Sequence, residues 1–275
     1  MDLVRVEDMK RREIKYSALA AALLIACGSD ADDAADPTAP PGSRFPVRVT
    51  HKFGSTEITS LPARVLSLGF NDHDALLALG VVPVAVRYWF SDEPVFPWAQ
   101  AKLNGATPAV QNMPANALDF EAIAAIAPDL IVAVYSGISQ EDYARLSQIA
   151  PTIAQSSDFI DYGMPWAETT LHVGKAFAME DEANEVVAGV EATIAETSKK
   201  YPEFAGAKAI VAATRADGSV RLYAAQDVRT RAILSLGLEV PAEIAALFGT
   251  TFVTDISGER IALLDTADVI IWRGG

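Results

Sequence analysis

The chain has 275 residues, of which 51% are apolar, and its formal net charge is −14. This length allows a large core in one domain or in two. The acidic balance argues against a nucleic-acid-binding protein, which needs a basic stripe, and against a surface that charge alone holds to anionic lipid.

The N-terminal residues predict export. Four basic residues between Lys10 and Lys15 precede an apolar run over residues 16–26. This order is typical of a secretory signal peptide, which we place at residues 1–26, and the run is too short to remain as a membrane-spanning anchor. Translation can start at Met1 or at Met9, and Met9 would place the basic cluster first.

The signal peptide is followed by the only cysteine of the chain, in the run Leu24-Ile25-Ala26-Cys27. This spacing resembles a bacterial lipobox, in which the cysteine carries a lipid. The alternative is a soluble export signal with a chance cysteine. Residues 27–44 are rich in Asp, Pro and Ala and predict a disordered tether. We therefore expect a protein anchored to the outer face of the cell membrane by a lipid on Cys27.

Residues 45–178 predict a first α/β lobe in which strands and helices alternate. Such alternation favours a parallel sheet covered on both faces. The predicted strands are 45–53 at an edge, then 64–68, 81–86, 130–134 and 152–154. The predicted helices are 75–79, 118–127, 140–148 and 166–178.

Residues 179–201 predict one long helix between two lobes. Ala183, Val187, Val190 and Ile194 form a helical stripe, acidic residues begin the segment, and Pro202 stops it. The pattern alone equally allows a surface helix within one domain. A repeat favours the two-lobe interpretation, because segments 119–132 and 257–271 both show a Glu, Ile-Ala, an Asp and an apolar strand.

Residues 202–275 predict a second α/β lobe, again with a parallel sheet. Its predicted strands are 208–213, 220–223 and 269–271, and its predicted helix is 227–236. Because this lobe stops at a strand, we expect it to be incomplete. The predicted fold is thus two Rossmann-like lobes with parallel sheets, joined by one spanning helix.

Aromatic and arginine side chains follow several of the predicted strands or begin the helix after them. Ligands of such sheets bind beyond the carboxyl ends of the strands, and rings with an arginine suit a flat or apolar ligand that bears negative charge. Each ring alone would more often be core filling. The candidate ligand-binding residues are Arg87, Trp89, Tyr135, Tyr162, Arg215, Tyr223, Arg229, Trp272 and Arg273.

Motifs of several catalytic classes are missing from the sequence. There is no Gly-x-Gly-x-x-Gly, no phosphate-binding loop and no Gly-x-Ser-x-Gly elbow. The histidines His51, His73 and His172 have no His or Cys at ligand spacing, so we expect neither a metal site nor a cofactor. An exported enzyme on this scaffold stays an alternative, but the sequence offers no convergent acid, base and nucleophile.

The whole pattern resembles the substrate-binding lipoproteins of bacterial ABC importers, in particular the helical-backbone class that serves ferric siderophores, haem and cobalamin. The residues that carry the resemblance are 64–68, 75–83, 119–132, 162–166 and 254–272. It implies a monomer with two rigid lobes and a shallow cleft, which captures a ferric siderophore without chemistry, iron entering only within the chelate. One alternative is a protein of the same family that binds haem or cobalamin. Another is a surface sensor or adhesion module on the same fold. Members of this family usually continue past the position of Arg273.

The resemblance also implies that one glutamate on each lobe docks onto arginines of the membrane permease. By motif these are Glu121 and Glu259, which both belong to the internal repeat. Two carboxylates at a fixed separation can orient a surface on a basic partner. The alternative is that both simply lie near helix N-termini, where acidic residues are favoured.

Overall fold

The computed structural model describes residues 44–88, 93–113, 117–249 and 251–273, all within one compact unit, Thr38–Gly275. The predicted signal peptide, Cys27, nearly all of the predicted tether and Trp89 lie outside the described residues. The predicted lobe boundaries stay a prediction. Among the described residues, no helix is both long enough and apolar enough to cross a membrane.

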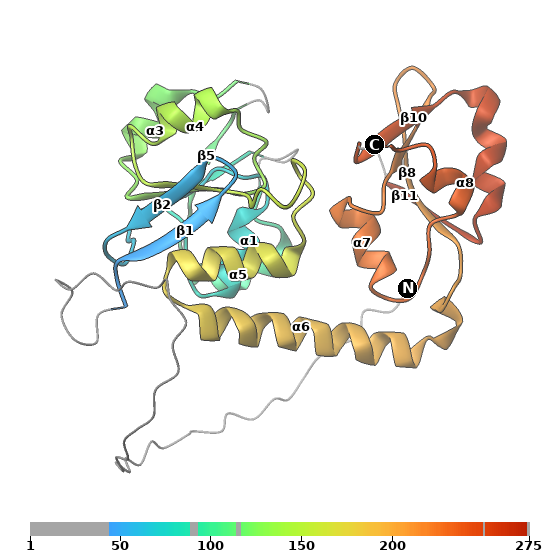
Figure 1. Ribbon diagram of the computed structural model, residues 1–275, viewed down its shortest axis with the longest axis horizontal. Coiled ribbons are helices and arrows are strands. Elements are labelled where there is room, and N and C mark those ends of the chain that lie inside the picture. Colours follow the sequence, from blue (N-terminus) through green and yellow to red (C-terminus); the bar gives the residue numbers. More distant parts are fainter. Residues whose placement is uncertain (1–43, 89–92, 114–116, 250, 274–275) are drawn as a thin grey trace, which may run out of the picture. The chain divides into compact units, whose positions relative to one another are not determined.

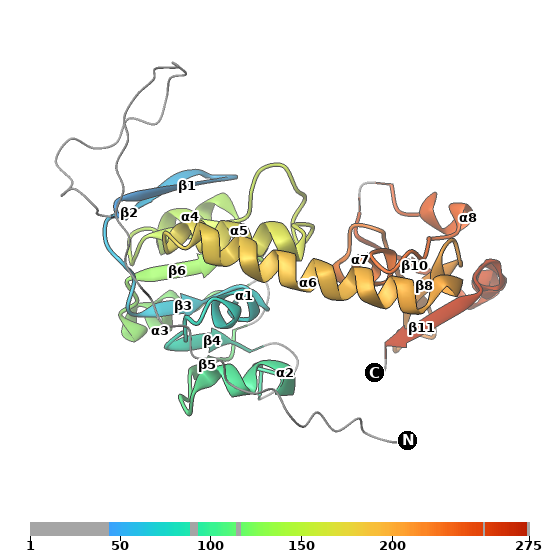
Figure 2. The ribbon, with the colours of Figure 1, turned by 90° about the horizontal axis from the view of Figure 1, so that it is seen from below.

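The first sheet has five strands in the order β5-β4-β3-β6-β7, and every pairing in it is parallel (Figures 1 and 2). This confirms the parallel sheet predicted for the first lobe. Four of its strands are fully buried, because apolar clusters cover both faces. The strands are β3 (Val65–Ser67), β4 (Ala85–Arg87), β5 (Ala109–Gln111), β6 (Leu130–Ala133) and β7 (Thr152–Ala154).

Alternate residues of each strand point to opposite faces of this sheet. On β6, Leu130 and Val132 join the cluster beneath α1 and α5, whereas Ile131 and Ala133 join the cluster beneath α3 and α4. The helices are α1 (Asp72–Ala78), α2 (Pro97–Gln100), α3 (Phe120–Ile126), α4 (Gln140–Leu146) and α5 (Trp166–Ala176), with a 3-10 turn, η1 (Ala101–Leu103).

An antiparallel hairpin of β1 (Val47–His51) and β2 (Gly54–Ile58) precedes the first sheet. The sequence predicted only one edge strand there, because Gly54–Ile58 contains few apolar residues. The hairpin nevertheless has a buried side, where Val49 and Ile58 pack into the cluster beneath α5.

The predicted long helix is α6 (Glu180–Lys200), which confirms that element. Its 21 residues span about 30 Å at 1.5 Å per residue. Its predicted stripe packs into the core at the N-terminal end, where Ala183 is buried against Gly174 of α5. Farther along, Val190 is 41% exposed, so this part of the predicted stripe does not form a core contact.

The second sheet has four strands in the order β10-β9-β8-β11, and only β8 and β11 are parallel. The prediction of a parallel second sheet is therefore wrong. Only residues 215–219 connect β8 to β9, and such a short connection permits a hairpin but not a crossover. The strands are β8 (Ala209–Thr214), β9 (Val220–Tyr223), β10 (Val253–Ile256) and β11 (Val269–Arg273).

The internal repeat is present as two helix–strand units of different helical type. The first is the α-helix α3 leading to β6, and the second is the 3-10 helix η3 (Gly258–Thr266) leading to β11. The other helices of this part are η2 (Pro202–Phe204), α7 (Val228–Leu234) and α8 (Ala242–Ala245). Whether the second lobe is incomplete stays a prediction.

Candidate ligand-binding site

The end of β6 carries a cluster of aromatic rings. The ring centroids of Tyr135 and Tyr162 are 5.2 Å apart, and Phe70, which follows β3, lies 6.4 Å from Tyr162. The Tyr162 hydroxyl donates to the carbonyl oxygen of Ser136 at 3.1 Å. These rings meet because parallel strands bring their carboxyl ends to one edge of the sheet.

Tyr162 has an unusual backbone in this cluster. Its φ is +62°, in the left-handed region that non-glycine residues rarely adopt. The hydroxyl contact with Ser136 and the ring contacts described above hold this conformation. The loop thereby presents a large ring beyond the sheet instead of burying it.

Arg87 joins the same cluster from β4. Its guanidinium carbon lies 4.5 Å from the centroid of Phe70, and its Nε donates to the carbonyl oxygen of Met113. Burial lowers the pKa of Arg87, and the nearby Tyr162 acts in the opposite direction. The side chain of Arg87 is fully buried and packs against the ring of Phe70.

A second cluster forms between β9 and α7. The guanidinium of Arg229 lies 4.6 Å from the ring of Tyr223, and Arg273 donates to the Tyr223 hydroxyl at 3.4 Å. Asp227 is fully buried, accepts the backbone N–H of Arg229 as the N-cap of α7, and pairs with its guanidinium at 2.9 Å. The positive charge of Arg229 is therefore already balanced.

Arg231 links the two clusters. Its Nη1 donates to the carbonyl oxygen of Gly163, next to Tyr162. The ring of Phe252 adds a second link, 5.7 Å from the ring of Tyr162. Tyr135 lines one cavity together with Val228 and Arg231 of α7. Burial raises the pKa of Tyr135 to about 12, and the charges of Asp227, Arg229 and Arg231 also act on it.

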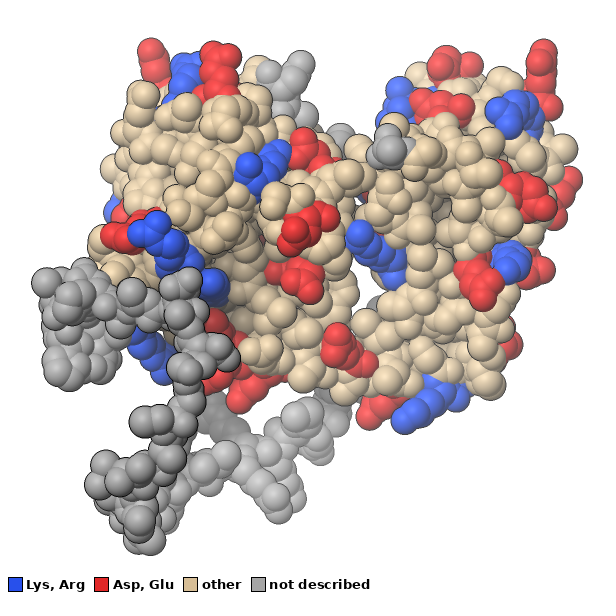
Figure 3. All heavy atoms as spheres, in the orientation of Figure 1, with Lys and Arg blue, Asp and Glu red and all other residues tan. Residues whose placement is uncertain are grey.

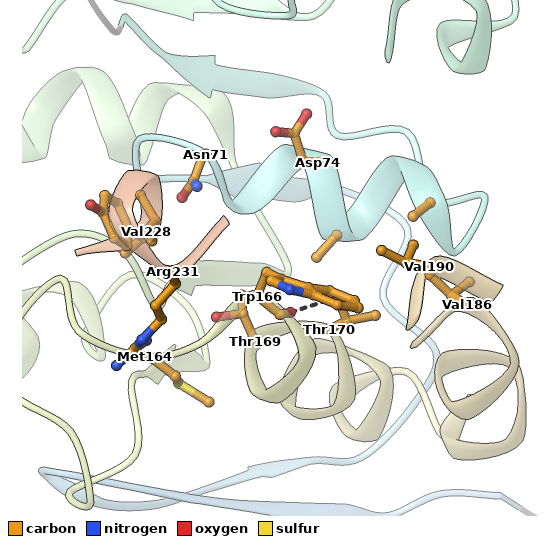
Figure 4. A pocket seen from close by; sticks show the side chains of 13 residues that line it. Asn71, Asp74, Met164, Trp166, Thr169, Thr170, Val186, Val190, Val228 and Arg231 are labelled. Atoms are coloured by element: carbon orange, nitrogen blue, oxygen red, sulfur yellow. Dashed lines mark hydrogen bonds between the residues drawn. The ribbon is translucent and has the colours of Figure 1, made fainter. Parts of the chain in front are cut away.

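A cavity of about 250 Å³ lies next to these links (Figure 4). The ring of Trp166 lies across its middle, with Arg231 and Met164 toward one end and Val186 and Val190 toward the other. Its lining comes from α1, α5, α6, α7 and the loops beside them and is mostly apolar. The cavity can therefore hold apolar groups, and its charged lining residues are Arg231 and Asp74.

The face shown in Figure 3 is mainly uncharged, with acidic and basic side chains scattered over it.

The structure brings six of the nine predicted ligand residues into these two clusters: Arg87, Tyr135, Tyr162, Tyr223, Arg229 and Arg273. Trp89 is outside the described residues. Their role in binding stays a prediction.

Arg215 and Trp272 lie away from these clusters. Arg215 follows the end of β8 where Thr214 pairs with Val220, whereas Tyr223 lies at the other end of β9. In the predicted parallel sheet, Arg215 and Tyr223 would both lie at the carboxyl ends of their strands and therefore at the same edge. Because β9 is antiparallel to β8, they lie toward opposite edges. Trp272 is 47% exposed, and neighbouring strand residues point to opposite faces, so it faces away from Arg273.

Sequence reasoning placed Phe70 at the end of a predicted strand and Arg231 near the start of a predicted helix, but it included neither in the list of candidate residues. Phe252 was not considered. Phe70 carried a usable signal, since it directly follows a buried strand and a glycine. Arg231 lies one helical turn after the N-cap of α7 and two residues after the candidate Arg229. Phe252 lies in a loop and has no signal in the sequence.

The two predicted docking residues occupy similar local positions. Glu121 is the second residue of α3 and Glu259 the second residue of η3, and both are exposed. Within the described ranges, no three His, Cys, Asp or Glu side chains come together in a way that could hold a metal ion.

The family model described as periplasmic binding protein matches residues 67–275. A periplasmic solute binding protein from Mycobacterium smegmatis str. MC2 155 is 39% identical, with a TM-score of 0.72 over 82% of this chain and 77% of that one. PiaA from Streptococcus pneumoniae TIGR4, solved in complex with ferrichrome, is 33% identical, with a TM-score of 0.73 over 83% and 79% of the two chains.

The probable siderophore-binding lipoprotein YfiY of Bacillus subtilis (strain 168) is 28% identical over 232 residues, which are 82% of this chain and 67% of that protein. The matches to curated relatives span between 46% and 67% of those proteins' own length. The family match covers most of the chain, and the solved relatives share its fold. The chain therefore belongs to the periplasmic binding protein family.

Proposed function

We propose that this protein captures a ferric siderophore outside the cytoplasm and delivers it to an ABC importer. The observation that carries the proposal is the pair of ring and arginine clusters joined by Arg231 and Phe252. Two relatives support the ligand class, because one is named as siderophore-binding and the other was solved with ferrichrome.

The chemistry of the clusters suits such a ligand. A ferric chelate presents flat or apolar faces around its iron, and the rings of Tyr135, Tyr162 and Phe252 offer matching contact area. Arg229 is neutralised by Asp227, whereas the described residues form no carboxylate ion pair with Arg231. Arg231 can therefore exchange its bond to the Gly163 carbonyl for an anionic oxygen of the chelate.

Tryptophan fluorescence provides the direct test. Trp166 lines the cavity and is 37% exposed, so a bound iron chelate should quench it. The full chain would be titrated with ferrichrome, ferric citrate, haem and cobalamin. Saturable quenching by a siderophore that is weaker in Trp166→Phe supports the proposal. Quenching by haem or cobalamin alone selects those ligands instead, and no quenching by any of the four refutes a transport role.

Delivery needs a contact with the permease and a position at the membrane. We propose that exposed Glu121 and Glu259 dock onto basic residues of the permease, since each lies at the start of a repeated helix–strand unit. We also propose that Cys27 carries a lipid anchor. The lipobox-like spacing supports this, and so do two relatives that are named as lipoproteins.

A further inference from the structure

Asp72, the first residue of α1, is a fully buried carboxylate at the end of the first sheet. Its Oδ2 accepts the backbone N–H of Val134 at 2.8 Å, and its Oδ1 accepts that of Tyr135 at 2.9 Å. The backbone N–H of Gly69, in the same turn, donates to the carbonyl oxygen of Val132 at 3.2 Å. The side chain therefore ties the turn after β3 to the end of β6.

The surrounding backbone leaves room for this side chain only because residue 69 is glycine. A Cβ atom on Gly69 would lie 2.0 Å from Oδ2 of Asp72. A bond in the reverse direction runs from the N–H of Phe70 to the carbonyl oxygen of Tyr135, at 3.0 Å. Both the N–H and the C=O of Tyr135 are thus held from the turn between β3 and α1.

The position of Tyr135 in turn decides where Tyr162 can lie. Ser136, the next residue, accepts the Tyr162 hydroxyl, and the rings of Tyr135 and Tyr162 are in edge contact. Tyr162 then reaches Phe252 across the site. If Asp72 moved, the backbone at Tyr135 and Ser136 would move with it. The rings of Tyr135 and Tyr162, which we propose contact the ligand, would then be displaced.

Asp72 is a carboxylate that is buried without a cation beside it in the described part of the chain. Among the described residues, no Lys, Arg or His forms an ion pair with it, so a buried carboxylate relies on neutral N–H groups alone. Such burial is costly. What an ionised carboxylate adds over an amide is acceptor capacity on both oxygens, which the two N–H groups of Val134 and Tyr135 require.

We propose that Asp72 is a positioning residue of the binding site, whose carboxylate fixes Tyr135 and through it the ring of Tyr162. This inference rests on the proposed function, because it assigns those rings to ligand contact. It predicts that the site is best formed when this carboxylate is ionised.

Protonation should loosen the clamp. Burial raises the pKa of Asp72 to about 7, with a further contribution from Asp74, while its hydrogen bonds with backbone N–H groups act against the rise. A proton on either oxygen would face a backbone N–H, so one bond would be lost. The titratable and charged groups around it are His73 and Asp74 on the same helix, Tyr135 beside it and, beyond Tyr135, Asp227, Arg229 and Arg231.

The test compares ligand binding by the wild-type chain and by Asp72→Asn. The ligand is ferrichrome, or ferric citrate if the wild-type chain binds only ferric citrate. At about pH 8 the variant should bind about tenfold more weakly, because its amide nitrogen faces a backbone N–H. At about pH 5.5 the two proteins should bind nearly equally, because wild-type Asp72 is then protonated. The ligand's own titration cancels in the ratio of the two dissociation constants.

Asp129→Asn is a matched control. Its Oδ1 and Oδ2 accept the backbone N–H groups of Arg64 and Ala63, both at 2.8 Å, at the opposite end of β3 and β6. The hydrogen-bonding pattern and the pair of strands are the same, but Asp129 is exposed and lies at the end of the strands away from the ring cluster. This variant should bind the chelate like wild type at both pH values.

Equal binding by Asp72→Asn and wild type at pH 8, or an equal loss in Asp129→Asn, would overturn the inference. A wild-type chain that binds no chelate refutes the proposed function instead. If Asp72→Asn does not fold, or if no chelate binds, the amide resonances of Val134 and Tyr135 in wild type still decide. Their chemical shifts should change with a midpoint near pH 7, and any pH dependence of chelate affinity should have the same midpoint. Chemical shifts that do not change with pH would refute the positioning role of Asp72.

Discussion

At the residue scale, Gly137 controls the space in which Tyr162 sits. A Cβ atom there would lie 2.1 Å from the Tyr162 hydroxyl, and the φ of Gly137 is +62°. Gly137→Ala should therefore displace the ring as well as strain the backbone. We expect a loss of about 1–2 kcal/mol in unfolding free energy and weaker ferrichrome binding, measured by urea unfolding and fluorescence titration.

Gly218→Ala separates these two effects. Gly218, in the turn between β8 and β9, has a similar φ of +80°, but no atom lies within 4 Å of the place that an added Cβ would take. This variant should show a comparable loss of stability with unchanged binding. If both alanine variants bind ferrichrome equally well, the ring of Tyr162 is not a ligand contact.

At the element scale, buried polar contacts attach the β1–β2 hairpin to the first sheet. His51 lies 2.9 Å from the Thr56 hydroxyl, which donates to the carbonyl oxygen of Thr152 on β7 at 2.6 Å. Burial lowers the pKa of His51 to about 4, and His172 adds to this effect. The folded protein therefore keeps His51 neutral where an unfolded chain would bind a proton.

The sign of the pH dependence follows from that difference. The unfolded state binds the extra proton below about pH 6.5, so the unfolding free energy should fall between pH 6.5 and about 4, by about 3 kcal/mol for this group. Urea unfolding of wild type and His51→Gln across this range measures it, because the variant lacks the titration. Parallel stability curves for the two proteins would contradict the assignment.

At the scale of the whole molecule, import should depend on Glu121 and Glu259 separately from binding. The double variant Glu121→Ala, Glu259→Ala should bind ferrichrome normally but lose most uptake of labelled ferrichrome by cells that depend on this protein. Both side chains are exposed at helix starts, so little change in stability is expected.

Two comparisons define the import experiment. The variant Glu191→Ala, Glu196→Ala removes the same charge from exposed positions on α6 and should import normally. Cys27→Ser should stop import for a different reason, by releasing the protein from the membrane fraction. Normal uptake by the Glu121 and Glu259 variant would refute the docking proposal.

The fold was predictable where local patterns carry the information. Four strands of the first sheet, α6 and the repeat follow from apolar runs, helical spacing and capping residues. The short strand β5 was not predicted, because it is largely exposed and has no apolar run. The mixed second sheet was missed although a signal exists. Asp217-Gly218 lies within a five-residue connection, 215–219, which favours a hairpin. Because β9 is antiparallel to β8, the candidates Arg215 and Tyr223 lie toward opposite ends of this strand pair.

The site was predictable only in part, for a related reason. Tyr135 and Tyr162 could be proposed because each lies near the end of a buried strand or its following loop. Arg231 and Phe252 reach the same place from a helix and a loop more than sixty residues later in the chain. No periodicity connects residues that far apart, so their meeting depends on strand order and helix packing.

The sequence by itself therefore determined the alternation of strands and helices, the long α6 and the acidic, ring-bearing character of the chain. Each of these depends on neighbours within a few residues, where spacing and capping decide the local structure. Only the tertiary structure decided which rings meet, that Asp72 is buried against the amides of Val134 and Tyr135, and that Arg231 reaches Gly163. Those contacts join segments that are distant in the sequence. Strand order and helix packing bring them together, and no local pattern encodes either.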